Sequence, residues 1–251
     1  MSGRDEILCF SRAEYAYLMQ AGRGGKIWGF APQQEERAER PERPERVKAF
    51  VRLTERGLIR LEEKGPVLSE KVRRMLRTLE NAGRACLEEY AFPDGMRIRL
   101  SCCHQETVVV QEPARGGQEI RMYERTCEDW QKETEERLKE IKSFVSQQGE
   151  RLLEELEAMR EEEAAYAELP AKEWEQMDCH MRTLLMRRME GETQIFRTDR
   201  IFDGRSSRYL ARMREKTGIC IYTQESASEL AGEWAGWIGR SGEEEGQDDF
   251  S

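Results

Sequence analysis

Two adjacent cysteine–histidine pairs are the residues of this chain whose types come closest to a chemical site. Cys103-His104 and Cys179-His180 include both histidines of the 251 residues. Thiolate and imidazole are preferred zinc ligands, so a site built from both pairs is chemically feasible. Neighbouring side chains, however, point to opposite faces of a strand and diverge by about 100° on a helix. We therefore interpret both pairs as loop or core residues and predict no metal site.

Other chemistry finds little support in the sequence. There is no GxSxG elbow, and none of the seven cysteines lies in a catalytic signature. Cys127, at the start of a predicted helix, could have a lowered pKa, but we interpret this as an accident of position. Residues 22–26, GRGGK, fail as a phosphate loop, because the glycine spacing is wrong and Ile27 stands where Ser or Thr would bind magnesium. We predict no catalytic residue, no cofactor and a non-enzymatic protein.

The overall charge disfavours nucleic acid as a partner. The net charge is −9, and phosphate contacts supply nearly all non-specific DNA affinity. No apolar run reaches the roughly 20 residues of a membrane helix, and the first residues do not form a signal peptide. We expect a cytoplasmic protein whose cysteines, odd in number and scattered, are free thiols.

Strands and helices alternate in the first part of the chain. Residues 6–10 predict a strand, Ser11 with Glu14 predicts a capping box that opens a helix, and residues 27–30 predict another strand. Residues 46–56 have helical periodicity, which Gly57 ends. The inward face of that helix is predicted to consist of Val47, Phe50, Val51 and Leu53.

The segment from Gly57 to Leu76 predicts a strand, a tight turn at Lys64-Gly65 and a helix capped by Ser69. The apolar face of that helix is Val72, Met75, Leu76 and Leu79. Helix, strand, turn and helix in this order are typical of a winged-helix DNA reader. In that alternative reading the protein is a transcriptional regulator, with the DNA-binding residues Lys71, Arg73, Arg74 and Arg77.

An antiparallel meander follows. Its predicted strands alternate or run apolar at strand length and cover residues 85–90, 97–103, 106–111 and 119–124. The turns contain Pro-Asp-Gly at 93–95 and Arg-Gly-Gly at 115–117, which accept positive φ at low cost.

The second half of the chain predicts helices and then strands. Residues 129–167 are periodic with a break near Gly149, and a second helix from Pro170 is predicted to carry Trp174, Met177, Met181, Leu184 and Leu185 on one face. This bundle could drive self-association, so a structural protein is a further alternative. Strands are predicted at 193–202 and 218–223. A capping box at Ser226 and Glu229 then opens a helix that carries Leu230, Trp234 and Trp237.

These elements predict an α+β fold with a central antiparallel sheet flanked by helical bundles. We expect a strand–helix unit at 1–32, a charged, proline-containing loop at 33–45 and a main domain at 46–240. The helical bundle falls at about 129–190 of that domain, and residues 241–251 form a disordered acidic tail.

The order of parts resembles the EspG-like chaperones of type VII (ESX) secretion systems. The resemblance is carried by RVKAFVRLTERGLI at 46–59, GPVLSEKV at 65–72, the strands MRIRL and ETVVV, and the ending GICIYTQES. It implies an adaptor without catalysis that shields an apolar helical tip of a secreted protein from water. We name candidate partner-binding residues from their type, since methionine and tryptophan suit adaptable interfaces. They are Trp174, Met177, Met181, Trp234 and Trp237, and the alternative is that they fill the protein's own core.

Overall fold

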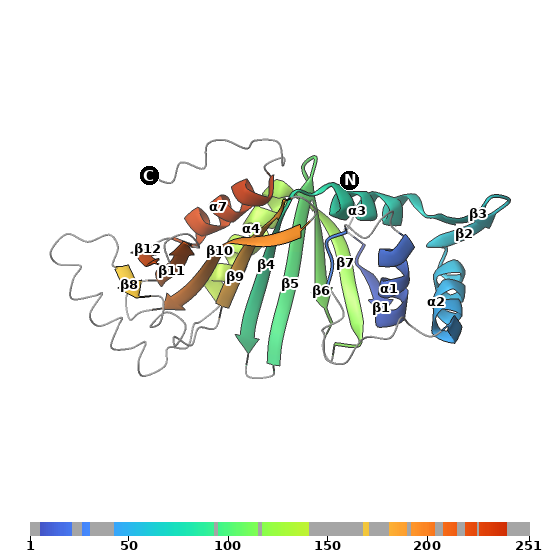
Figure 1. Ribbon diagram of the computed structural model, residues 1–251, viewed down its shortest axis with the longest axis horizontal. Helices are drawn as coiled ribbons and strands as arrows, with labels where there is room; N and C mark the ends of the chain where they lie inside the picture. Colours follow the sequence, from blue (N-terminus) through green and yellow to red (C-terminus); the bar gives the residue numbers. More distant parts are fainter. Residues whose placement is uncertain are drawn as a thin grey trace.

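The computed structural model describes residues 6–21, 27–30, 43–92, 95–114, 117–140, 168–170, 181–189, 192–203, 208–214, 219–224 and 226–239. They form a ten-stranded antiparallel sheet, in the order β1-β7-β6-β5-β4-β9-β10-β11-β12-β8, and a separate two-stranded sheet, β2-β3. Helices pack on both faces of the large sheet (Figure 1). The predicted α+β class with a central antiparallel sheet is confirmed.

The chain begins at one edge of the sheet. Strand β1 (Leu8–Ser11) pairs with β7, and helix α1 (Arg12–Ala21) follows it directly. The predicted capping box is present, because the Ser11 N–H donates to Glu14 Oε2 over 2.7 Å and the Glu14 N–H donates to Ser11 Oγ over 3.3 Å.

Residues 27–30 do not form the predicted strand. Their backbone hydrogen-bonds to the end of a helix instead of to a strand, since the Trp28 N–H donates to the Leu79 carbonyl over 3.2 Å. The Trp28 indole also donates to the Ala82 carbonyl over 2.7 Å. This segment therefore closes the first core rather than extending the sheet.

The helix–strand–turn–helix segment is confirmed as α2 (Arg43–Glu55), β2 (Ile59–Glu62), β3 (Gly65–Leu68) and α3 (Glu70–Asn81). Gly57 has a φ of 68°, as expected of a glycine that ends a helix. Ser69 caps α3 by accepting a hydrogen bond from the Val72 N–H. The four apolar residues predicted for the inward face of α3 are all buried.

The predicted meander is also confirmed. It consists of β4 (Arg84–Phe92), β5 (Gly95–His104), β6 (Thr107–Pro113) and β7 (Glu119–Thr126), each antiparallel to the next. Helix α4 (Cys127–Glu140) begins directly after β7.

The predicted helix through Met181, Leu184 and Leu185 is wrong. These residues lie in strand β9 (Met181–Met189), which pairs with β4 and with β10 (Glu192–Asp203). Met181, Thr183 and Leu185 are buried with the period of two that is typical of a strand. The apolar spacing of this segment is therefore compatible with a strand as well as with a helix, and pairing with the two neighbouring strands selects the strand. The predicted bundle therefore does not reach residue 190. Residues 141–167 and 171–180, with Gly149, lie outside the described chain.

The last strands extend the sheet beyond β10. The predicted strands at 193–202 and 218–223 correspond to β10 and β12 (Ile219–Gln224). Between them lies β11 (Arg208–Arg214), and β8 (Glu168–Pro170) pairs with β12. Neither β11 nor β8 was predicted. Helix α7 (Ala227–Gly239) begins with the predicted capping box, in which the Ser226 N–H donates to Glu229 Oε2 over 2.8 Å.

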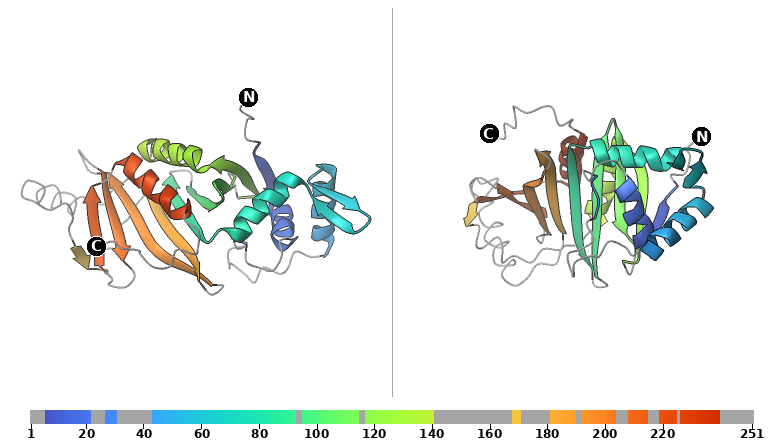
Figure 2. Two further views of the ribbon diagram at one scale, coloured as in Figure 1. Left: turned by 90° about the horizontal axis from the view of Figure 1, so that it is seen from above. Right: turned by 45° about the vertical axis from the view of Figure 1, so that its right-hand side comes forward.

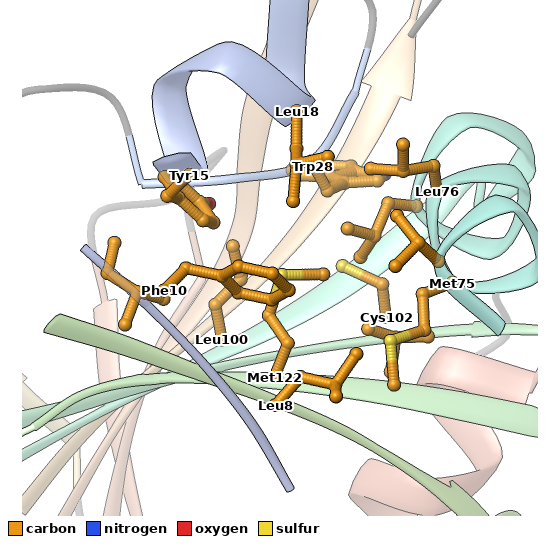
Figure 3. Packing of buried hydrophobic residues seen from close by; sticks show 14 of the residues in the cluster. Leu8, Phe10, Tyr15, Leu18, Trp28, Met75, Leu76, Leu100, Cys102 and Met122 are labelled. Carbon is orange, nitrogen blue, oxygen red and sulfur yellow. The ribbon is translucent and has the colours of Figure 1, made fainter. Parts of the chain in front are cut away.

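The sheet separates two hydrophobic cores. The first includes Phe10, Leu18, Met75 and Leu100, and it is closed by α1, α3 and Trp28 (Figure 3). The second lies on the opposite face under α4 and α7, where Trp130 and Trp234 are completely buried. Strands β4 and β5 contribute to both cores, so the centre of the sheet is covered on each side.

Candidate partner-binding surface

Helix α2 and the β2–β3 hairpin project from one end of the molecule. They lie at the end opposite strands β8 and β12, and the hairpin forms the tip (Figures 1 and 2). We call these residues, 43–68, the arm. The two strands pair with each other and not with the large sheet, so the described hairpin gains no support from a third strand.

The base of the arm is fixed to the body. Leu53 and Ile59 are buried in the first core, on either side of the turn at Gly57. The Arg56 guanidinium donates to Glu14 Oε1 over 3.2 Å and to the Cys9 carbonyl over 2.7 Å. These contacts tie the turn to β1 and α1, so the arm starts from a rigid point.

The outer surface of the arm carries exposed apolar side chains. Val47 and Val51 are 56% and 45% exposed, and Leu61 is 71% exposed. The prediction that Val47 and Val51 point inward is therefore wrong. The buried stripe of α2 is Ala49 with Leu53, which turns both valines to solvent four residues apart on one helix face.

Leu61 is exposed for a different reason. It shares a strand face with Ile59, which is buried, but the hairpin extends beyond the core at that point. The exposure of Leu61 could not be predicted from its spacing, because a period of two predicts a common strand face and not where the core ends. The neighbouring pair Glu62-Glu63 was the available signal, since two charged residues in succession indicate that the strand is leaving the core.

The described residues that were predicted to bind a partner lie in the second core instead. Met181 is 1% exposed, Trp234 is 0% and Trp237 is 6%. Their burial corresponds to the alternative in which they fill the protein's own core, and it corrects the expectation that they face a partner. Trp174 and Met177 lie outside the described residues.

The basic residues of α3 are largely engaged by carboxylates. Lys71 Nζ lies 3.1 Å from Glu6 Oε2, and Arg73 Nη2 lies 3.0 Å from Glu70 Oε2. Arg74 Nε donates to Glu124 Oε1 over 2.7 Å, and the contact raises the pKa of Arg74. Arg77 is exposed. A helix whose cations already face acidic partners offers little positive potential to phosphates, so this geometry does not favour the DNA-binding alternative.

The described charged residues beneath α4 form a network inside the protein. Glu88 is completely buried and accepts hydrogen bonds from Tyr90 Oη over 2.5 Å and from Arg137 Nη2 over 2.9 Å. Arg99, which faces Glu88 across the β4–β5 pair, lies 3.5 Å from Glu112. These groups neutralise one another, so the network joins α4 to the sheet rather than presenting charge to a ligand.

The zinc hypothesis finds no counterpart in the described residues. They contain no group of three or more His, Cys, Asp and Glu side chains that could hold a metal ion. Cys103 and His104 are consecutive on β5, and Cys103 faces the second core. Cys179 and His180 lie outside the described chain.

Within the ranges that the structure describes, no helix combines the length and apolar character needed to cross a membrane. No protein-family model matches the sequence. No curated protein is significantly similar to it.

A comparison with solved structures finds a match across nearly the whole chain. The chain is similar to the Mycobacterium tuberculosis type VII secretion system chaperone EspG5, solved in complex with the PE25–PPE41 dimer, with a TM-score of 0.52 and 9% sequence identity. The match covers 93% of this chain and 95% of that chain. At this identity the likeness is one of fold alone.

Proposed function

We propose that this protein is a non-enzymatic adaptor or chaperone that binds a helical protein partner, and that the partner is a substrate of type VII secretion. The observation that carries the proposal is the fold likeness, over more than nine-tenths of both chains, to a secretion chaperone solved with a bound protein dimer. The identity of 9% supplies no matching binding residues, so the contact surface is inferred from this chain's own side chains.

The arm is the best-supported contact surface among the described residues. Val47 and Val51 form one apolar face of α2, and Leu61 stands on the adjoining hairpin. An apolar helix face can pack against a similar face of a partner, as in helix-in-groove recognition. Covering such side chains contributes about 25 cal/mol for each Å² of apolar surface removed from water. The rigid base at Arg56 lowers the entropic cost of ordering the arm on binding.

Co-expression of the tagged full chain with each protein encoded beside it tests the proposal. We expect a small helical neighbour to be retained through affinity purification and to elute with the chain in size-exclusion chromatography. The double variant Val47→Lys/Val51→Lys and the single variant Leu61→Ser should each weaken retention about fivefold or more, since the loss of an interface anchor costs above about 1 kcal/mol.

Matched controls lie on the same elements. Lys48→Ala on α2 and Arg60→Ser on β2 change exposed residues beside the apolar ones, and both should retain the partner. Retention of a partner that none of the arm variants weakens would reject the arm as the contact surface. Failure to retain any neighbouring protein would reject the proposed function.

A further inference from the structure

Two cysteines from different elements meet beneath the start of α4. Cys103 Sγ, near the end of β5, lies 3.2 Å from Cys127 Sγ, on the first residue of α4. Both residues carry free thiols in this structure. The sulfur atoms of a disulfide are about 2.05 Å apart, so a bond would require an approach of about 1.2 Å.

The backbone around the two thiols is held by several hydrogen bonds. The Cys127 N–H donates to the Glu106 carbonyl over 3.2 Å, which joins the start of α4 to the turn that follows β5. Thr126 caps the helix, because its Oγ1 accepts the Asp129 N–H over 3.0 Å. The proximity of the sulfurs therefore follows from the paired strands and the helix cap together.

The two thiols differ in exposure and in acidity. Cys127 is partly exposed, whereas Cys103 is buried. The hydrogen bond from Cys103 lowers the pKa of Cys127 to about 7, against the opposing effect of partial burial. The same hydrogen bond, together with burial, raises the pKa of Cys103. An accessible thiolate beside a second thiol is the arrangement that favours disulfide formation over irreversible oxidation.

We propose that Cys103 and Cys127 form a reversible disulfide that fastens the start of α4 to the sheet, with hydrogen peroxide or a low-molecular-weight disulfide as the oxidant. With peroxide, the Cys127 thiolate attacks one oxygen, the O–O bond breaks, and a sulfenic acid and hydroxide form. The Cys103 sulfur then attacks the sulfenic sulfur, the S–O bond breaks, and the departing hydroxide takes up the thiol proton as water. The hydroxide from the first step takes up the proton that Cys127 released on ionising. The two thiols thus lose two electrons in total, and the peroxide is reduced to two water molecules.

The bond would constrain the chain over a separation of 24 residues and enclose β6 and β7. Helix α4 covers the second core through Trp130 and Leu138, so fastening its first turn opposes the opening of that face. A native-like disulfide of this loop length should raise the melting temperature by roughly 4–16 °C. This inference concerns the chain alone and stands whether or not the arm binds a partner.

The test uses the full chain, reduced and then exposed to hydrogen peroxide or to glutathione disulfide. Free thiols are blocked with N-ethylmaleimide, and the digest is mapped by mass spectrometry. We expect a linked peptide pair containing Cys103 and Cys127, absent after treatment with dithiothreitol, and a higher melting temperature for the oxidised chain. Since the map of the unsubstituted protein already decides the connectivity, the test does not depend on a variant folding.

Variants show which thiol reacts first. Cys127→Ser should abolish the linked pair, and Cys103→Ser should leave a sulfenic acid on Cys127 that dimedone captures. The control Cys9→Ser, at another partly exposed cysteine, should form the link as the original chain does. The proposal is overturned if Cys127 accumulates as an adduct without the link, if it links to a different cysteine, or if the linked chain melts no higher than the reduced one.

Discussion

The Trp234 indole donates a hydrogen bond of 3.0 Å to Asp199 Oδ2, and both side chains are completely buried. The same carboxylate oxygen accepts from Arg197 Nη2 over 2.8 Å. Arg197 in turn reaches Glu233 on α7, and Arg212 on β11 lies 2.7 Å from the same Glu233 carboxylate, so residues of β10, β11 and α7 form one group. The bond explains why Trp234 belongs to the core: its polar atom has an internal acceptor, and its ring covers the sheet.

Replacing Asp199 by Ala should destabilise the protein strongly. The variant leaves the Trp234 N–H without this acceptor and removes the buried partner of Arg197, and breaking a buried ion pair on one side costs about 3–5 kcal/mol. Urea denaturation of the two chains measures the difference. Thr198→Ala, on the opposite face of β10 and half-buried, is the control and should cost under about 1 kcal/mol. Equal losses of unfolding free energy in the two variants would show that the buried hydrogen bonds and ion pairs of Asp199 do not contribute more to stability than an ordinary strand residue.

Local patterns in the sequence predicted the parts of the fold whose partners are close along the chain. Both capping boxes, the Ser69 cap and the turn at Lys64-Gly65 depend on residues within a few positions, and the structure contains them. The meander was predictable for the same reason, because each strand pairs with the next.

Elements that depend on distant partners were harder to predict. Strand β9 fits between β4 and β10 although about 90 residues separate it from β4, and its apolar spacing also fits a helix. The predicted buried face of α2 was wrong for a related reason. Ala49 is small enough to pack closely against the core, but its short side chain gives little hydrophobic signal in the sequence. The meeting of Cys103 and Cys127 required the register of β5 with β6 and of β6 with β7, which no local motif specifies.

Burial should make the ionisation of Glu88 costly. Burial raises the pKa of Glu88, against the opposing effects of Arg99 and of the hydrogen bond from Tyr90. The folded chain thus holds this proton more tightly than the unfolded chain. Its contribution to stability is fully present below the ordinary glutamate pKa of about 4.3 and is lost as the pH rises through the raised value.

Urea denaturation at several pH values, from about 4 to about 7, checks this expectation against Glu88→Gln. The original chain should lose stability relative to the variant as the pH rises. Glu89→Gln on the same strand is the control, because Glu89 faces the half-exposed Arg182 and such pairs contribute under about 1 kcal/mol. A gain of the original chain over Glu88→Gln across this range would mean that Arg99 and Arg137 outweigh burial.

The thiol of Cys127 should react at lower pH than an ordinary cysteine. Its pKa is lowered to about 7 by the hydrogen bond from Cys103, so the folded state favours the thiolate. The associated stabilisation is present above the ordinary thiol pKa of about 8.5 and is lost as the pH falls through about 7. Alkylation of the Cys127 peptide by iodoacetamide, followed by mass spectrometry, should therefore rise with a midpoint near pH 7.

Substitution of Cys103 tests whether its hydrogen bond is the cause of the lowered Cys127 pKa. Cys103→Ala should move the midpoint of Cys127 alkylation upward, towards the ordinary value, whereas Cys9→Ser should leave it in place. An unchanged midpoint in Cys103→Ala would assign the acidity to the helix start instead of to the neighbouring thiol.

The same substitution, Gly→Ala, should have opposite effects at two exposed glycines. Gly57 has a φ of 68° and an added Cβ would meet no atom within 4 Å, so only the backbone conformation opposes alanine there. Alanine in the left-handed region costs about 1–2 kcal/mol, and Gly57→Ala should lower the free energy of unfolding accordingly. Gly236 also has open space around it but lies within α7. Gly236→Ala should therefore raise that free energy by about 0.5–1 kcal/mol through helix propensity. Urea denaturation measures both variants. An equal loss of unfolding free energy at Gly236 and at Gly57 would contradict this account, because an added Cβ meets no atom within 4 Å at either site and only the backbone conformation differs.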